Sequence, residues 1–504
     1  MGAEDIANLI KEINEVNNRQ YIQQLNWPEI EKHLINRIDR QVSIKISFFY
    51  NCSFLGQYFS DKFFQWVYVE SMKILEQQIN YDFYQSRWIA LNITLLSKLY
   101  SSNKLTPEQS QQLIDFAKEY ALLIPDKYQN ISRREVTQGN DFATITFHLK
   151  NLGITDMPEV YVYLENQLLN FCDSLNKVSL MLLIQSFGIG YIHSQTLFFW
   201  VTEKLYAKSN SLSDLKLHEL AIFISCLSKF WVFQASSNFL DSIKERVREF
   251  IEVDQSNQID YYIFQLLKIH NSIIQLPELS EEKEKLESLL LQIVDESVGM
   301  NRRCYLLFSL INNNKYEVAQ KYFDKYIKNQ LGFDPERDKQ MTEQMKKLAI
   351  YDLRLIYYCI SHFNVVHKNY TDLEYNTALL GAMKDLKPNQ QIINISDFSA
   401  RASEIIKAFV KQYNLEMIEE LDVGLYFIDI YIPEKNIAVE VQGLQHFCWR
   451  QNIQNAKSMA KQRYLKALGF EVVYINVLDM ASTRDYNLLD SMVQNAIKNH
   501  LESQ

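Results

Sequence analysis

The sequence predicts a mostly α-helical protein in which an N-terminal α-solenoid of helix-turn-helix repeats precedes a small C-terminal α/β domain. Apolar residues recur at helical spacing from about residue 5 to 385, and only 12 Gly and 8 Pro occur in 504 residues. Strand-like runs first appear after Tyr413. The predicted organisation is therefore helical repeats over 1–385, a linker over 386–395 and an α/β domain over 396–504.

Composition limits the classes of function. The hydrophobic fraction of 47% and the charged fraction of 22% are ordinary for a globular protein. The net charge of −9 is not that of a typical nucleic-acid binder, so any RNA contact must be a local patch. The six cysteines lack CxxC spacing, which favours buried thiols of an intracellular protein over a zinc site or a disulfide framework.

The helical region carries start signals and a repeat. Thr106 is expected to cap a helix, with Pro107 at its first position and Gln109 completing a capping box. Five apolar positions in similar contexts lie 35, 40, 42 and 41 residues apart: Leu152, Phe187, Leu227, Ile269 and Leu310. This interval is that of a two-helix unit stacked into a solenoid. An irregular helical bundle is the alternative.

One segment, 178–201, contains no charged residue and is long enough to cross a membrane. The Gly188-Ile189-Gly190 break and the polar residues within it favour two short buried helices joined by a turn. We therefore expect no membrane span. The N-terminus lacks the features of a signal or transit peptide.

The C-terminal domain is predicted to have the order α-β-β-β-α-β. Ser396 can cap a helix that runs to about Tyr413. Strand-like runs follow at 415–421, 424–434 and 436–443, and a helix over 453–470 is expected to end at Gly469 before a fourth strand at 471–477.

Two carboxylates are expected to meet in this domain. Alternation along "NIAVEVQG" sets Ala438, Glu440 and Gln442 on one face of a strand, and hairpin pairing brings Asp429 of the preceding strand beside Glu440. A buried carboxylate needs a partner, a metal or a raised pKa. Glu404, on the preceding helix, adds a third carboxylate if it faces inward.

The pattern Asp-x10-Glu-x-Gln in this order of elements resembles the PD-(D/E)xK nuclease fold. The resemblance implies that Asp429 and Glu440 occupy the positions that hold Mg²⁺, while Gln442 stands where a lysine helps to activate water. An amide supplies no positive charge, so we expect cleavage to be crippled or lost.

A closer resemblance, over residues 425–480, is to the RAP domain, an RNA-binding domain of that nuclease-like fold. It rests on "FIDIYIPEKNIAVEVQGLQHF", on three residues of the following helix and on "LGFEVVYIN", although Gln442 departs from the usual Asp. The FAST-kinase group has the same order of helical repeats and RAP domain. The resemblance implies a protein without a cofactor that binds mitochondrial rRNA or mRNA, with ribosomal or other ribonucleoprotein components as partners.

The residues expected to contact RNA lie in 441–470, which contains five Lys/Arg and no acidic residue. The candidates are four cations and two rings for stacking: Arg450, Lys457, Lys461, Arg463, His446 and Trp449. A solvated basic helix face is the alternative. His362 and His367 lack the spacing of a shared ligand face, and core or surface positions are expected for them.

We therefore predict a non-catalytic organellar RNA-binding protein, such as a subunit of a mitochondrial ribosome. Two alternatives stay open. One is a Mg²⁺-dependent endonuclease that uses Asp429, Glu440 and Gln442, with the first two as metal ligands. The other is a scaffold that binds only proteins. A mitochondrial location follows from the resemblance, and a cytoplasmic one is the alternative because no presequence is recognisable.

Overall fold

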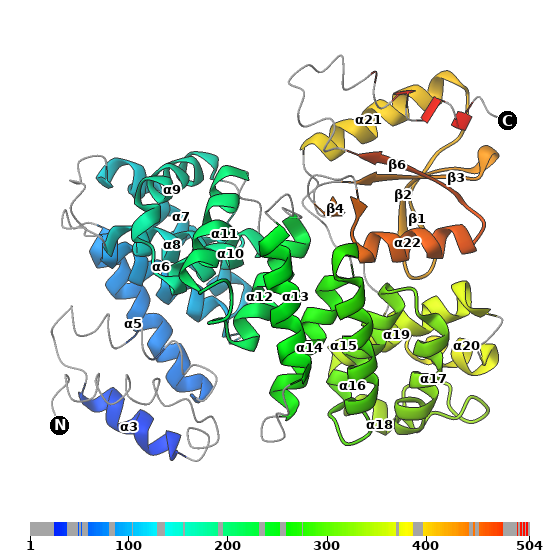
Figure 1. Cartoon of the computed structure of the whole chain (residues 1–504), viewed down its shortest axis with the longest axis horizontal. Coiled ribbons are helices and arrows are strands. Elements are labelled where there is room, and N and C mark those ends of the chain that lie inside the picture. The colour runs from blue at the N-terminus through cyan, green and yellow to red at the C-terminus, as the bar shows by residue number, and fades with distance from the viewer. Residues whose placement is uncertain are drawn as a thin grey trace. The chain divides into compact units, whose positions relative to one another are not determined.

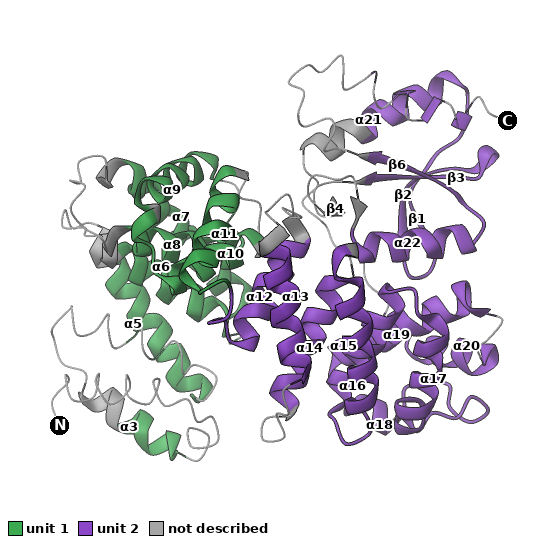
Figure 2. Cartoon of the chain, viewed as in Figure 1, with its two compact units in different colours: residues 1–211 green, residues 212–504 purple. Residues whose placement is uncertain are grey.

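The structure is a computed structural model of the whole chain (Figure 1). It describes residues 25–37, 49, 52, 59–79, 86–102, 104–128, 137–154, 157–189, 195–230, 237–252, 259–274, 276–368, 372–386, 397–442, 447–448, 453–476, 491, 494–495, 497–498 and 500–501. The chain divides into two compact units, residues 1–211 and 212–504 (Figure 2), and each is described by itself.

The first unit is helical. Its described helices are α3 (Trp27–Arg37), α5 (Asp61–Ile79), α6 (Ser86–Tyr100), α7 (Pro107–Tyr128), α8 (Thr137–Asn151), α9 (Pro158–Phe171), α10 (Lys177–Ile189) and α11 (Gln195–Lys208). Helix α8 packs between α6 and α10, and α9 packs between α7 and α11. Alternate helices thus form two layers, which is the arrangement predicted for stacked helical pairs.

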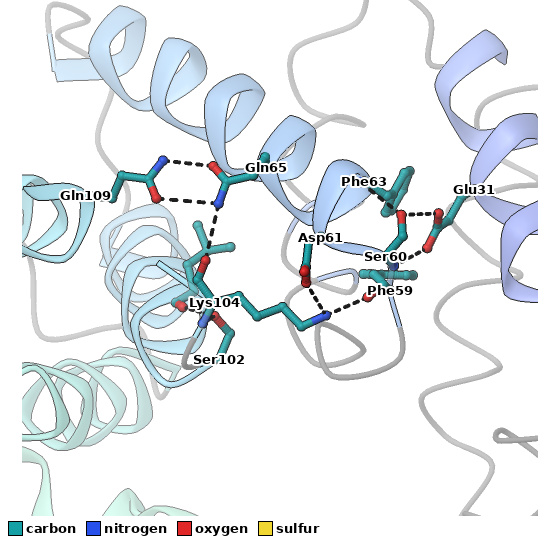
Figure 3. Close-up of polar contacts among 10 residues, drawn as sticks. Glu31, Phe59, Ser60, Asp61, Phe63, Gln65, Ser102, Lys104 and Gln109 are labelled. Atoms are coloured by element: carbon teal, nitrogen blue, oxygen red, sulfur yellow. Dashed lines mark hydrogen bonds and ion pairs between the residues drawn. The ribbon is translucent and has the colours of Figure 1, made fainter. Parts of the chain in front are cut away.

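Polar side chains determine where helices of the first unit begin, and Figure 3 shows one such contact, that of Glu31 with Ser60. The predicted capping box of α7 is confirmed. Gln109 N–H donates to Thr106 Oγ1 at 3.3 Å, and the Gln109 side-chain oxygen accepts from Thr106 N–H at 3.1 Å. Glu31 of α3 accepts from both the N–H and the hydroxyl of Ser60, at 2.5 and 2.6 Å, directly before α5.

The second unit continues the helical pairs. Its helices before the sheet are α12 (Leu217–Phe230), α13 (Ser237–Glu252), α14 (Ile259–Ile273), α15 (Ser280–Ile293), α16 (Met300–Asn312), α17 (Tyr316–Tyr326), α18 (Glu343–Lys346), α19 (Ile350–Val366) and α20 (Leu373–Ala382). Helices α12, α14, α16 and α19 pack side by side in that order, and α13 packs on α15. We call α12, α14, α16 and α19 the inner helices.

The predicted repeat is confirmed by the positions of its apolar residues. Phe187, Leu227, Ile269 and Leu310 lie on α10, α12, α14 and α16, and Leu152 directly follows α8. All five side chains are buried. Each therefore occupies the same place in a successive helical pair, which is why the intervals between them are nearly constant.

The chain ends in a mixed sheet with helices on both faces. The elements are α21 (Asp397–Gln412), β1 (Ile418–Asp422), β2 (Phe427–Ile432), β3 (Ile437–Gln442), β4 (Phe447–Cys448), β5 (Ile453–Gln454), α22 (Ala456–Ala467) and β6 (Glu471–Asn476). The main sheet has the order β1-β2-β3-β6, with β6 parallel to β3 and the other pairs antiparallel. The predicted order α-β-β-β-α-β is confirmed.

Two details of this domain differ from the prediction. Residues 453–454 pair with β4 as a short strand, and the helix begins after Asn455, whose side chain accepts from Ser458 N–H at 3.0 Å. Helical spacing alone did not reveal this N-cap. Gly469 follows the end of α22 with φ of 96°, as predicted for a C′ glycine.

The two faces of β3 pack against different partners. Ile437, Val439 and Val441 join Ile406 and Val410 of α21 in one buried cluster. On the opposite face, Ala438 packs with Ile428 and with Leu465 of α22. Glu440 belongs to this second face, so α22 lies over its strand (Figure 1).

The described residues of the charge-free segment 178–201 belong to two helices, α10 and α11, as predicted, and the turn expected between them lies outside the described residues. Within the described residues, none of the helices combines the length and the apolar character that a membrane crossing requires. The side chains of Cys52, Cys226, Cys304 and Cys359 are buried and are not joined in disulfides.

Candidate functional site

The β2–β3 hairpin brings Asp429 and Glu440 together. Ile430 pairs with Val439 and Tyr431 with Ala438, so Asp429 and Glu440 follow as the next pair in register. Asp429 Oδ2 accepts from Val441 N–H at 2.7 Å. The carboxylate therefore takes the place of a backbone acceptor at the point where the ladder of the two strands ends.

A lysine from α22 completes the group. Lys461 Nζ lies 2.5 Å from Glu440 Oε2 and donates to the carbonyl oxygen of Phe427 at 2.7 Å. Glu440 is 2% exposed, and its Oε1 has no hydrogen-bond partner among the described residues. The carboxylate is thus enclosed between the sheet and α22, with its charge matched by one ammonium group. We call Asp429, Glu440 and Lys461 the acidic triad.

Burial controls protonation in the acidic triad. It holds the pKa of the Glu440 carboxyl above its usual range, with Asp429 acting in the same direction and the Lys461 ammonium opposing it. Burial likewise raises the pKa of Asp429, against the opposing effects of Lys461 and the Val441 N–H. The site therefore tolerates one negative charge beside its lysine more readily than two.

The triad does not fit a Mg²⁺ ion as it stands. Magnesium is usually held by one or two carboxylates together with several waters. Here one oxygen of Glu440 contacts Lys461, one oxygen of Asp429 holds a backbone N–H, and Glu440 is almost sealed from solvent. Glu404 adds no third carboxylate, because its largely exposed side chain pairs with Lys407.

The predicted RNA-binding residues fall into three groups. His446, Trp449 and Arg450 lie outside the described residues, as does the side chain of Gln442. Lys457 is exposed on the first turn of α22, and its Nζ lies 5.8 Å from the ring centroid of Phe308. Lys461 and Arg463 make contacts inside the protein, so RNA would have to compete for them.

Arg463 joins α22 to the inner helices. Its guanidinium donates to the carbonyl oxygens of Ile311 and Asn312, at 3.1 and 3.2 Å, and to the hydroxyl of Tyr316 at 3.3 Å. These carbonyl groups are at the C-terminal end of α16, where a helix has unsatisfied acceptors and partial negative charge. A cation is stabilised there without any nucleic acid.

A buried network surrounds this junction. His362 of α19 is fully buried, with Nε2 2.9 Å from the Tyr426 hydroxyl and Nδ1 3.3 Å from the Tyr316 hydroxyl. The Tyr426 hydroxyl donates to Tyr358, and the Tyr464 ring packs on His362. Burial, with a contribution from Arg463, lowers the pKa of His362 to about 3. Of the core and surface positions that were expected for this histidine, the structure shows the core one. We call these residues with Arg463 the junction network.

No model of a known protein family matches this chain. The resemblance to the RAP domain therefore stays a prediction from the motif residues. The fold itself is observed: a helical array followed by a four-stranded mixed sheet covered by α21 and α22.

The partnership of Lys461 with Glu440 was missed from the sequence, although a signal for it exists. Lys461 precedes the buried Leu465 by four residues, so both lie on the face of α22 that covers the sheet. A lone lysine on the apolar face of a helix, opposite a strand glutamate, indicates an internal ion pair. The lack of acidic residues around it favoured a binding surface instead.

Proposed function

We propose that this protein binds RNA without cleaving it. The observation that carries the non-catalytic part is the contact of 2.5 Å between Lys461 and Glu440. This ion pair occupies the Glu440 carboxylate, which a nuclease would need as a ligand of its metal ion. The Glu440 side chain also has little access to water. The nuclease-like sheet then serves as a scaffold for α22 and the segments around it.

The cations available for RNA on α22 differ from those predicted. Lys457 and Lys466 are exposed at the two ends of the helix, whereas Lys461 and Arg463 are engaged inside the protein. The helix has no acidic residue that would repel phosphate. The acidic triad holds α22 against the sheet, and the exposed lysines of this helix can contact RNA phosphates. Such contacts do not depend on the RNA sequence.

The direct test measures binding of a labelled single-stranded RNA to the full chain at several salt concentrations. Replacing Lys457 and Lys466 by Gln should weaken binding and reduce the slope of log affinity against log salt by roughly 0.7 for each lysine–phosphate pair that is removed. The control replaces exposed Lys73 and Lys321 by Gln, which changes the net charge equally. If wild-type protein binds no RNA, the proposal fails and a scaffold role is favoured.

A metal-dependent nuclease is the second candidate, and one observation favours it. Lys461 brings a cation to the acidic pair from a different element, which supplies the charge that Gln442 lacks. Incubation of the full chain with RNA or DNA and Mg²⁺ or Mn²⁺ distinguishes the two functions. We expect intact substrates. Cleavage that is abolished in both Asp429→Ala and Glu440→Ala would replace the binding-only proposal.

The resemblance to RAP proteins adds a location and partners to the proposal: mitochondrial rRNA or mRNA, and the proteins of a mitochondrial ribosome or another ribonucleoprotein. Imaging of a C-terminally tagged chain should show a mitochondrial signal. Sequencing of RNA crosslinked to it in cells should be enriched in organellar transcripts. A purely cytosolic signal would overturn the organellar assignment and leave RNA binding itself to the assay above.

A further inference from the structure

The solvent-facing side of the inner helices is rich in aromatic rings. Residues three or four apart on each helix lie on this side, outside the buried face: His218 on α12, Tyr261, Phe264 and Lys268 on α14, Arg302 and Tyr305 on α16, and Tyr351 and Arg354 on α19. We call this set the aromatic stripe. It follows four helices that pack side by side, and α22 contacts the last two of them.

The rings contact one another from helix to helix. Ring centroids are 6.5 Å apart for His218 and Tyr261, and 6.5 Å apart for Phe264 and Tyr305. Phe308, a buried ring of α16, lies 6.3 Å from Tyr305 and 5.1 Å from Tyr358. Lys457 of α22 reaches the same Phe308. Ring contacts thus connect α12 with α14 and α14 with α16, and Phe308 links Tyr305 to Tyr358 and to Lys457 of α22.

Cations accompany the rings. Lys268 Nζ and Arg302 Cζ lie 4.3 and 4.2 Å from the ring centroid of Phe264, and Arg354 is exposed on α19. Cations thus accompany the rings of α14, α16 and α19, and at the α12 end Asp214 lies beside His218 and Lys216.

A hollow lies at the α12 end of the stripe. Its volume is about 360 Å³, and its lining includes Lys216, His218, Arg246 and Tyr261. Arg246 stacks over Phe250, with Cζ 4.3 Å from the ring centroid. The size is at the lower end of that of small-ligand sites, which is suitable for a nucleobase. Its walls offer a ring for stacking and the ammonium group of Lys216 for the attached phosphate, whereas Arg246 is paired with Glu249 and Asp214 adds a carboxylate.

We propose that the aromatic stripe binds single-stranded RNA by stacking bases on its rings, with one base in the hollow. This inference rests on the proposed RNA binding and adds a site for it on the helical array. Tyr261 and Tyr351 are 48% and 61% exposed, so both rings present apolar surface to water. Rings interleaved with cations are the arrangement by which proteins hold single strands without reading their sequence.

The test compares the full chain with Tyr261→Ala and Tyr351→Ala, alone and combined. Each change should weaken binding of a single-stranded RNA roughly tenfold, while duplex RNA of the same length is affected little. Tyr261→Phe and Tyr351→Phe keep the ring and should bind as wild type does. Phe199→Ala, at a ring that is 46% exposed on α11, is the matched control. Unchanged circular dichroism and melting temperature establish that each variant is folded.

The outcomes separate the two proposals. Wild-type binding that persists unchanged in the double alanine variant overturns the stripe and leaves RNA binding to α22. An equal loss of RNA affinity in Phe199→Ala or in the phenylalanine variants also overturns the stripe proposal, because the loss then does not come from removing the Tyr261 and Tyr351 rings. If the wild-type chain binds no RNA, both proposals fail, and binding of a peptide or protein becomes the expected role of the stripe.

Discussion

The guanidinium of Arg463 donates to the carbonyl oxygen of Asn312, so α22 is tied to the end of α16 across 151 residues of sequence. The same guanidinium bonds to Ile311 and Tyr316. Buried hydrogen bonds from a charged donor to a helix end are among the stronger polar contacts in proteins. The α/β domain and the inner helices are therefore held in one arrangement within the second unit.

Arg463→Ala should destabilise the second unit by about 2–3 kcal/mol, because the carbonyl groups at the end of α16 lose their donor. Hydrogen exchange followed by mass spectrometry should show faster exchange in α16 and α22, while peptides of the first unit keep their rates. Arg463→Lys keeps the charge without the planar fork and should recover only part of the loss. A variant with wild-type stability and lower RNA affinity would instead indicate a direct role in binding.

Lys461→Met should cost about 1–3 kcal/mol, since the buried Glu440 carboxyl loses its partner and, with its pKa already raised by burial, must take up a proton. Adding Glu440→Gln replaces that carboxyl by a neutral group, so the double variant should lose less stability than the sum of the two single variants. Urea denaturation of the two single variants and the double variant gives the coupling energy. Lys466→Met, at an exposed lysine of the same helix, is the control and should change little. Additive losses would show that the two groups do not interact.

Stability should fall in acid because His362 is buried in its neutral form. Its pKa is lowered to about 3 by burial, whereas the unfolded chain takes up the proton near pH 6.5. Between these values the unfolded state binds one more proton, so the free energy of unfolding falls by about 1.4 kcal/mol for each pH unit lowered.

The measurement is urea denaturation at several pH values between 7 and 4. His362→Gln should lose stability less steeply than wild type as the pH falls, by the slope of one proton. Tyr358→Phe removes a hydroxyl of the junction network but no acid-titrating group, so its deficit should stay constant over this range. Parallel slopes for wild type and His362→Gln would refute the neutral buried histidine.

Thr106→Ala should destabilise the first unit by about 1 kcal/mol, because the N-terminal turn of α7 loses its cap. Thr106→Ser keeps the hydroxyl and should retain most of the stability. Exchange rates in the first turn of α7 provide the measurement. If alanine and serine variants have the same rates, the Gln109 side chain alone accounts for the start of the helix.

Much of the fold could be predicted from sequence because its signals are local. Thr106 and Gln109 are three residues apart, and the constant interval between Leu227, Ile269 and Leu310 reflects one apolar position in each helical pair. The strands were predictable from alternation around Glu440. The strand at 453–454 was not predicted, because two residues are too few to show a periodicity. Its pairing with β4 depends on residues that only the fold brings together.

The site was predictable only in part, for the same physical reason. Asp429 and Glu440 belong to one hairpin, so strand register brings them together. Lys461 comes from another element, and Arg463 and His362 meet across about 100 residues. The spacing of these residues along the chain therefore does not predict these contacts. An acid-free helix has the same composition whether its cations face RNA, a buried carboxylate or the end of another helix.

The junction network bears on whether the C-terminal domain is a portable module. Tyr426 and Tyr464 contact His362 of α19, and Arg463 bonds to the end of α16 and to Tyr316 of α17, so a fragment of residues 396–504 would leave these three side chains without their partners. Each buried polar group that loses its partner costs about 1–3 kcal/mol, which is large against the stability of a domain of this size. Gene fusion or domain shuffling that transferred the sheet would have to carry these three helices with it, and residues 212–504 are the smallest piece expected to be inherited whole.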